Sequence, residues 1–235
     1  MKVVPVKSLF ENDIADILNN PKYKHIGVVD RGFVSVENIP TEAILFLGIN
    51  PSYTKPIRGL TFYELYQRKN SYKQYFGKFE DLSEKVGLIW GHMDLLYFQE
   101  TQQSAIDDIM QQQDGVQFIW EQLQASKKIL ESANPKILIV SNTKARQFLG
   151  KDKSKGKNEW LNYDFLFDNA IGTYRLKTQS SNLYNIPVFF TSMFTGQRAL
   201  DTGSYERLVW HIKFVLNIEK NNPNSQTLKQ VAPSE

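Results

Sequence analysis

The sequence predicts one α/β domain over residues 1–220, a three-layer structure with a central, mostly parallel sheet of four strands flanked by helices. Two observations predict this fold class. Four short apolar runs have the length and composition of buried strands. Segments with the apolar spacing of helices separate these runs, and such alternation is typical of parallel α/β sheets. Residues 221–235 are polar and predict a disordered tail.

The first half of the chain begins with a helix candidate at residues 11–20 and a strand candidate at residues 25–37. The first core strand follows at residues 43–48, where five apolar residues lead into Gly48. Residues 51–86 are mixed in character and rich in aromatic side chains. We therefore expect one or two helices in that segment, covering the mouth of a site.

The second half continues the alternation of strands and helices. Apolar runs predict three further strands, at residues 88–98, 135–141 and 186–192. Helical spacing and helix-end residues predict helices at residues 114–133, 142–150 and 204–218. Residues 163–177 predict a hairpin.

Three helix ends carry recognisable signals. Asp114 and Gln117 have the spacing of a capping box, in which two side chains cap the first turn reciprocally. Asn142 or Thr143 is expected as the N-cap of the next helix, and Gly150 as its C-terminal stop.

Composition excludes several classes of site. The chain has no cysteine, which excludes disulfides, thiolate nucleophiles, cysteine-ligated zinc and iron–sulfur clusters. His25, His92 and His211 lie far apart without metal-ligand spacing, so we expect structural or surface roles for them, and neither metal nor cofactor. The net charge of +3 neither requires nor excludes a nucleic-acid partner. No apolar run approaches the roughly 20 residues of a membrane helix, so we expect a cytoplasmic monomer.

A dense set of polar and rigid residues follows the first core strand, in the sequence Gly48-Ile49-Asn50-Pro51-Ser52-Tyr53. A strand–loop junction of this composition can simply be a turn, since Asn and Pro favour turns. Parallel α/β sheets, however, bind ligands at the carboxyl ends of their strands. The position of this segment therefore favours a binding site.

Four segments, in this order, resemble the uracil-DNA glycosylase superfamily. LGINPS (residues 47–52) resembles the first motif of its mismatch-type branch, a strand leading into Gly-x-Asn-Pro-Gly or Gly-x-Asn-Pro-Ser. HMDLLYFQET (92–101) resembles the second strand, which delivers the base-reading residue. ANPKILIVSNTKARQFLG (133–150) resembles the third strand and its helix. IPVFFTSMFTGQRALDTGSYERLVWHI (186–212) resembles the last strand, the DNA-contacting loop and the final helix.

The resemblance implies a pocket for a base that has been flipped out of the DNA, stacked on an aromatic ring and read along its edge. Asn50 would position the water that attacks the sugar. Phe62 would be the stacking ring, with Tyr75 and Phe76 as rivals, and Asp94 would read the base. The pocket would be shaped by the remaining motif residues, namely Gly48, Ile49, Pro51, Ser52 and Tyr53.

The loop after the last strand departs from the family pattern. Where the family usually has His-Pro-Ser or Asn-Pro-Ser, this chain has Met193-Phe194-Thr195, so the residue that would stabilise the transition state is missing. The resemblance still assigns DNA contacts to this loop, with Phe194 as a wedge and Arg198 on a phosphate. Arg198 could equally pair with Asp201. The predicted DNA-contacting residues are Phe194, Thr195, Gly196, Gln197 and Arg198.

Asp94 also departs from the family pattern, in which many members have Asn. An ionised Asp only accepts hydrogen bonds, whereas Asn both donates and accepts. Asp94 would repel a developing uracil anion and favour a base edge rich in donors, such as that of adenine, cytosine or guanine. The alternative is a structural role, in which Asp94 accepts hydrogen bonds from backbone amides at the strand end.

Three hypotheses follow. The first is a DNA glycosylase that hydrolyses the N-glycosidic bond of a flipped damaged or mismatched base. The second is a non-catalytic module that binds nucleic acid or a nucleobase through the same fold. The third is a small-molecule or nucleotide enzyme that shares only the α/β plan, because fold alone does not determine function.

Overall fold

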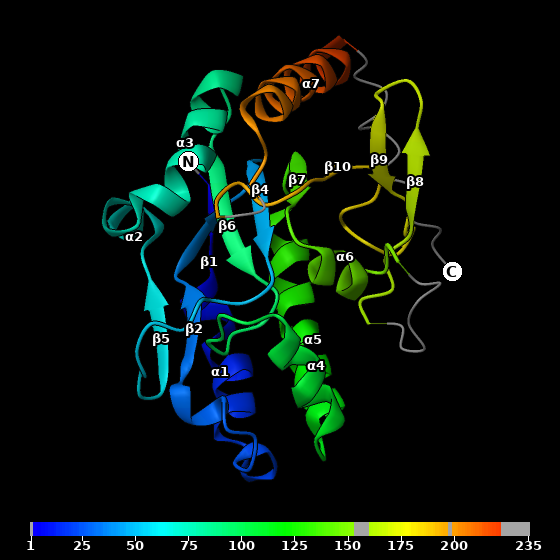
Figure 1. Cartoon of the computed structure of the whole chain (residues 1–235). Helices are drawn as coiled ribbons and strands as arrows, with labels where there is room; N and C mark the ends of the chain where they lie inside the picture. Colours follow the sequence, from blue (N-terminus) through cyan, green and yellow to red (C-terminus); the bar gives the residue numbers. More distant parts are fainter. Residues whose placement is uncertain (1, 153–159, 197–198, 222–235) are drawn as a thin grey trace.

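The central sheet has six strands, in the order β6-β4-β7-β10-β9-β8 (Figure 1). The computed structural model describes residues 2–152, 160–196 and 199–221. The strands, in chain order, are β4 (Ile44–Gly48), β6 (Trp90–Asp94), β7 (Ile137–Val140), β8 (Phe165–Asp168), β9 (Thr173–Leu176) and β10 (Pro187–Phe190). The expected α/β class is confirmed, but the sheet is mixed and has six strands, where a mostly parallel sheet of four was expected.

The two additional strands come from the predicted hairpin. Strands β6, β4, β7 and β10 are parallel neighbours, whereas β9 is antiparallel to β10 and to β8. The sequence indicated the hairpin but not its place in the sheet. An isolated hairpin is only marginally stable, and a free edge of β10 would expose unpaired backbone groups. Pairing β9 with β10 stabilises the hairpin and supplies hydrogen-bond partners to that edge.

The order of the parallel strands creates a switch point at β4. The chain runs from β4 to β6 on one side and then returns to β7 on the other side of β4. In open α/β sheets, loops diverge at such a point and leave a crevice at the carboxyl ends of the strands. The loops that follow β4 and β6 lie at this end.

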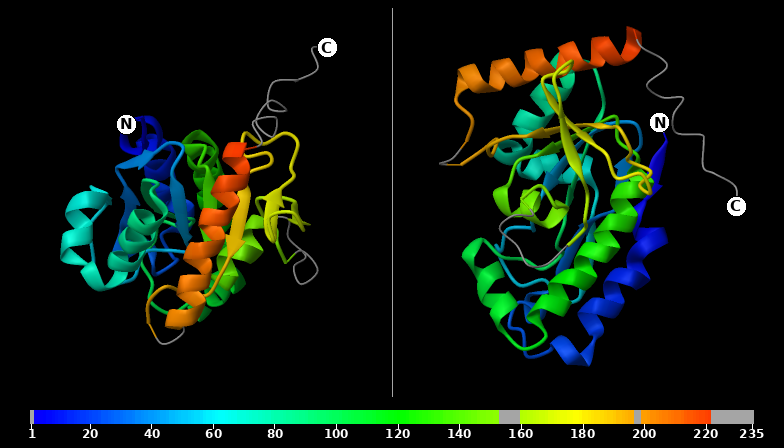
Figure 2. Two further views of the ribbon diagram at one scale, coloured as in Figure 1. Left: turned by 90° about the horizontal axis from the view of Figure 1, so that it is seen from above. Right: turned by 90° about the vertical axis from the view of Figure 1, so that its right-hand side faces the viewer.

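Helices cover both faces of the sheet, as the view from above shows (Figure 2). On one face α1 (Val6–Asn19) packs against α5 (Gly115–Ala133), and on the other face α3 (Lys73–Val86) packs against α7 (Thr202–Asn221). Three shorter helices complete the described set: α2 (Leu65–Ser71), α4 (Ser104–Gln111) and α6 (Thr143–Leu149). Helices α2 and α3 are the two expected between residues 51 and 86.

Two small sheets and two single turns lie beside the main sheet. Strand β1 (Val3–Pro5) pairs with β3 (Asn38–Pro40), and β2 (Phe33–Val36) pairs with β5 (Leu60–Tyr63). The strand expected at residues 25–37 is therefore shorter. Its first part forms turns and the single 3₁₀ turn Val29–Arg31, and Gly32 at φ 77° separates this turn from β2.

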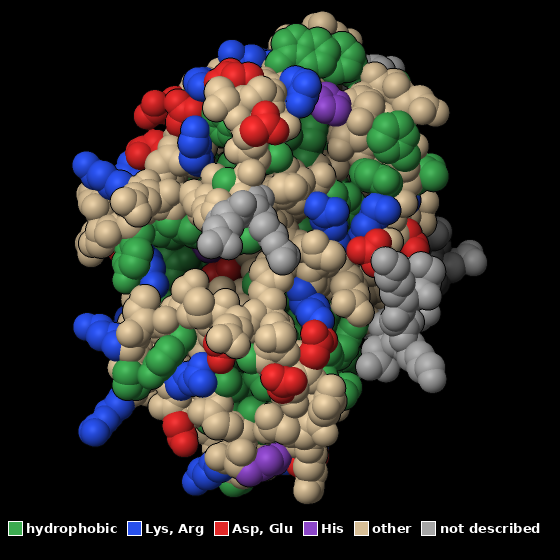
Figure 3. Space-filling model, viewed as in Figure 1, with side chains coloured by type: hydrophobic (Ala, Val, Ile, Leu, Met, Phe, Trp, Pro, Cys, Tyr) green, Lys and Arg blue, Asp and Glu red, His purple; other side chains and the backbone are tan. Residues whose placement is uncertain are grey.

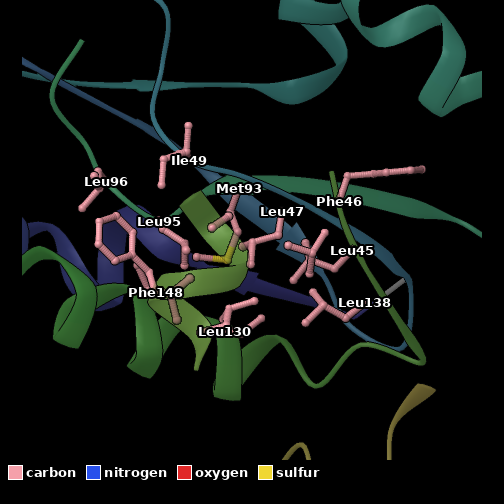
Figure 4. Close-up of a cluster of buried hydrophobic side chains, with 14 of the residues drawn as sticks. Leu45, Phe46, Leu47, Ile49, Met93, Leu95, Leu96, Leu130, Leu138 and Phe148 are labelled. Atoms are coloured by element: carbon pink, nitrogen blue, oxygen red, sulfur yellow. The ribbon is translucent and has the colours of Figure 1, made fainter. Parts of the chain in front are cut away.

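The core is centred on β4 and β7, whose residues are all buried. Strands covered on both faces need apolar side chains on both faces, which explains their continuous apolar sequences. Figure 4 shows Leu45 and Leu47 of β4 in a cluster with Met93 and Leu138 of the neighbouring strands. Close packing of this kind resists deformation, so these strands give the loops at their carboxyl ends a firm support.

The helix ends agree with the sequence in one case and differ in another. Asn142 is the N-cap of α6, where its Oδ1 accepts hydrogen bonds from the amides of Lys144 and Ala145, and Gly150 ends that helix at φ 108°. The capping box at Asp114 is wrong. Asp114 is left-handed at φ 61°, its side chain makes no capping bond, and it forms an ion pair with Lys22 instead.

Across the described ranges, no helix has both the length and the apolar character needed to cross a membrane. The predicted tail falls on residues that the structure does not describe, apart from Asn221, which ends α7.

Candidate active site

A cavity of about 210 Å³ lies at the carboxyl ends of β4 and β6, beneath α2 and α3. Figure 3 views the molecule from the side of Figure 1 and shows a hollow near the middle of this face. The cavity is lined by residues from the β4 loop, β5, both helices and β6: Asn50, Pro51, Ser52, Thr54, Tyr63, Arg68, Tyr72, Tyr75, Phe76, His92 and Asp94. Two residues that the resemblance places in the site, Asn50 and Asp94, therefore meet in one cavity.

The pairing of β4 with β6 brings Asp94 to the cavity floor. Gly48 stands in register with Asp94, and Phe46 with His92. A Cβ atom on Gly48 would lie 2.0 Å from the Asp94 Oδ1 atom, so only glycine leaves room for the carboxyl group. This close approach gives a packing reason for the glycine that precedes Asn50 by two positions.

Asn50 is held by backbone atoms rather than by other side chains. Its Nδ2 group donates hydrogen bonds to the carbonyl of Glu100 at 2.6 Å and to the carbonyl of Pro51 at 3.0 Å. The Glu100 side chain is anchored in turn by an ion pair with Arg31 at 2.6 Å. Because Nδ2 is engaged, Oδ1 is left as a hydrogen-bond acceptor, and the described residues supply it with no partner.

His92 is buried beside the cavity and is neutral. Its Nδ1 atom lies 3.2 Å from the Tyr63 hydroxyl and its Nε2 atom lies 3.4 Å from the Tyr75 hydroxyl. Burial, helped by the positive charge of Arg68, lowers the pKa of His92 to about 3. Burial also raises the pKa of both tyrosines, so both hydroxyls keep their protons and hold the imidazole between them.

Asp94 has a carboxyl group with an unusually high pKa. Its side chain is only 11% exposed, and its Oδ1 atom lies 4.0 Å from Nε2 of the uncharged His92. Burial raises the pKa of Asp94 to about 7, against a smaller lowering by Arg68. The expectation of an ionised, accept-only Asp94 therefore needs correction, because near neutral pH a large share of this carboxyl is protonated and can also donate.

Arg68 of α2 is the cation among the described residues that line the cavity. Its guanidinium carbon lies 4.5 Å from the ring centroid of Tyr63 and 5.1 Å from that of Tyr72. Cation–π contacts of this kind hold a guanidinium group through its flat faces. The site thus combines one cation, one titratable carboxyl and one amide.

Aromatic rings form much of the cavity wall. Tyr72, Tyr75 and Phe76, all at the start of α3 or just before it, line the cavity, so the two rivals of Phe62 are both in place. Phe62 does not line it. Its strand, β5, pairs with β2 so that Phe62 stands opposite Ser35, whereas its neighbour Tyr63 turns to the cavity because adjacent residues of a strand face opposite sides.

The remaining residues of the first motif divide into three groups. Pro51 and Ser52 line the cavity with Asn50. Gly48 lies beneath it, and Ile49 is buried. Tyr53 is exposed and is not among the residues that line the cavity, and the guanidinium carbon of Arg31 lies 4.6 Å from its ring centroid.

The predicted DNA-contacting loop is placed differently from the expectation. Phe194 is 6% exposed and packs edge-on against Phe46 and Phe79, so it is a core residue and not a wedge at the surface. Thr195 is half-buried and Gly196 is exposed with φ 85°. Gln197 and Arg198 lie outside the described residues.

Sequence reasoning missed His92, Arg68, Tyr63 and Tyr72. One signal could have found His92, which lies two positions before Asp94 on a strand and so shares its face. No local signal distinguishes Arg68 from Lys69, the other cation of α2. The described ranges contain no cluster of three His, Asp or Glu that could hold a metal ion.

Comparison of the sequence with protein-family models and with curated proteins identified no relative. No protein-family model matches the sequence, and no curated protein matches it significantly.

Proposed function

We propose that the chain is a divergent member of the uracil-DNA glycosylase superfamily, with the corresponding fold, that hydrolyses the N-glycosidic bond of a flipped damaged or mismatched base. The observation that carries this proposal is the convergence of Asn50 and Asp94 on one cavity walled by aromatic rings. These are the positions that the resemblance assigns to water positioning and base reading. The proposal extends to a cytoplasmic monomer that binds DNA.

The size and walls of the cavity suit a single nucleobase. A volume of about 210 Å³ is below the roughly 300 Å³ at which pockets for drug-sized ligands begin. Tyr72, Tyr75 and Phe76 offer ring surfaces against which a flat base can stack. A base edge needs both donors and acceptors opposite it, and Asp94 near its pKa supplies either.

Asn50 has the geometry of a residue that positions water. Its Nδ2 group is fixed on the Glu100 carbonyl, so the direction of its Oδ1 acceptor is fixed as well. A water molecule that donates to Oδ1 is oriented but hardly deprotonated, because an amide is a very weak base. Such a catalyst relies on the leaving tendency of the base, which suits damaged bases with weakened glycosidic bonds.

Base release tests this proposal. The purified protein is incubated with oligonucleotides that carry uracil, hypoxanthine, xanthine, alkylated bases or mismatches, and abasic products are cleaved with alkali. We expect release from at least one substrate and a loss of about 100-fold or more in Asn50→Ala, similar to the cost of removing one preorganised hydrogen-bonding side chain from other active sites. Asn70→Ala, at an exposed position of α2, is the matched control and should leave the rate unchanged.

The second candidate is a module that binds a nucleobase or nucleic acid without cleavage. The burial of Phe194 favours it, because a protein that flips bases in a duplex commonly inserts a side chain into the gap. Absence of release from every substrate, together with salt-dependent DNA binding, would reject the glycosylase and support this module.

A further inference from the structure

Arg68 differs from an ordinary surface cation in its surroundings. Its guanidinium group forms no hydrogen bond and no ion pair with the described residues, although the residue is only partly exposed. Its contacts are the rings of Tyr63 and Tyr72, at 4.5 and 5.1 Å from the guanidinium carbon. Ring faces hold the cation but use none of its N–H groups in conventional hydrogen bonds, so the donors along its edge stay available to a ligand.

The opposite charge in the cavity does not neutralise Arg68 directly. Asp94 lines the same cavity, and the positive charge of Arg68 lowers its pKa, yet no ion pair within 4.0 Å joins the two. His92 carries no positive charge at neutral pH, because burial lowers its pKa to about 3. Arg68 is therefore the cation that the described cavity wall presents to a ligand.

We infer that Arg68 is the anion-binding residue of this cavity and holds the negative charge that develops on the leaving nucleobase. The inference rests on the proposed function and adds to it the group that receives the leaving charge. Met193, Phe194 and Thr195, which stand where the family usually has His-Pro-Ser or Asn-Pro-Ser, are all neutral.

The chemical step balances without a further reactant. The bond between C1′ of the sugar and the base nitrogen breaks, and its electron pair stays on the base. The oxygen of the water oriented by Asn50 forms the new bond to C1′, and a proton from that water ends on the base after departure. Arg68 keeps its proton throughout and donates hydrogen bonds to the base while the base is anionic, which lowers the barrier by electrostatic stabilisation.

An equilibrium measurement tests the anion site independently of catalysis. Calorimetry at pH 6.5, where most of the Asp94 carboxyl is protonated, compares uracil, which is neutral there, with 5-nitrouracil, which is ionised there. We expect the wild-type protein to bind 5-nitrouracil about tenfold or more tightly than uracil, as hydrogen bonds from a charged donor to an anion predict. Arg68→Gln should lose this preference and Arg68→Lys should keep part of it.

Arg58→Gln is the matched control, because it removes the same charge from an exposed position outside the cavity. It should keep the preference. Thermal unfolding of each variant establishes that it is folded. Equal binding of both probes by the wild type, binding of neither, or an unchanged preference in folded Arg68→Gln would overturn the inference.

Base release separates the two proposals. If the wild type releases a base and Arg68→Gln releases it as fast, Arg68 is not the anion-binding group and the glycosylase proposal survives. If the wild type releases no base but prefers 5-nitrouracil through Arg68, the anion site stands and the glycosylase proposal fails. Slower release in Arg68→Gln, with the largest loss for the poorest leaving base, supports both.

Discussion

Two arginines in this protein have opposite surroundings. Arg175 of β9 is 7% exposed and its guanidinium is fully engaged, since it donates to Asp168 at 2.7 Å, to the carbonyl of Asn185 at 2.9 Å and to Glu219 at 2.7 Å. Arg68 lines a cavity and has only ring faces as close contacts. The hydrogen-bond donors of Arg175 are thus used within the fold, whereas those of Arg68 remain available to a ligand.

The nearby carboxyl groups show the same contrast. Burial alone would raise the pKa of Asp168, but hydrogen bonds from Arg175 and from the Ala170 amide outweigh it and hold that pKa below its usual value. Asp94 lacks a close cation, and burial raises its pKa to about 7. In the Arg175 cluster the cation and its carboxylates are joined by hydrogen bonds, whereas Arg68 and Asp94 line one cavity without forming an ion pair.

The largest expected effect is on stability at Arg175. Replacement by Gln removes a buried cation from two carboxylates, and we expect a loss of about 3 kcal/mol in the free energy of unfolding. Urea unfolding at pH 7 measures it. A loss below about 1 kcal/mol would show that the Arg175 cluster does not stabilise the fold and would contradict the structural role that distinguishes Arg175 from Arg68.

The second effect is a pH dependence at Asp94. Between about pH 4 and pH 7 the folded protein keeps the Asp94 proton that the unfolded chain, with a pKa near 3.8, has lost. Stability must therefore fall as pH rises through this window. Asp94→Asn removes the titration, so its stability relative to the wild type should increase by on the order of 3 kcal/mol from pH 4 to pH 8. Urea unfolding at a series of pH values checks this, and a pH-independent difference would contradict the raised pKa.

The third effect concerns how Asp94 is accommodated. Gly48→Ala would place a methyl group against the Asp94 carboxyl, and overpacking of this kind costs about 1–3 kcal/mol. The same substitution in an Asp94→Ala background should cost distinctly less, because the clashing atom is gone. A double-mutant cycle measures the coupling, and additive costs would mean that the two residues do not press on each other.

The smallest effect is on stability at Arg68. Since Arg68→Gln breaks no hydrogen bond and removes only cation–π contacts, we expect a loss of at most about 1 kcal/mol. The measurement is the same urea unfolding used for Arg175. A loss as large as that of Arg175→Gln would assign Arg68 a structural role.

The first-motif residues and Asp94 were accessible to sequence reasoning, and the other half of the cavity wall was not. Asn50 and Asp94 directly follow or end apolar strands, so their place at one edge of a parallel sheet could be predicted. Tyr63 comes from the short strand β5, Arg68 from α2, and Tyr72 from the position directly after α2. Their approach to β6 depends on packing between segments that no local pattern records.

Phe194 illustrates an error with the same origin. An aromatic residue in a loop looks like a surface wedge when only its neighbours in sequence are considered. In the fold, its ring reaches Phe46 of β4 and Phe79 of α3, and burial of that apolar surface favours the core position.

Local patterns in the sequence were enough to predict the four parallel strands of the main sheet, most of the helices and the edge at which a site would lie, because apolar periodicity and turn residues act locally. The tertiary structure alone decided that the hairpin extends the sheet, that His92 is neutral and that Asp94 titrates near pH 7. It also decided that Arg68 faces the cavity unpaired. These properties depend on burial and on distances between residues far apart in the chain, which exist only once the elements have packed.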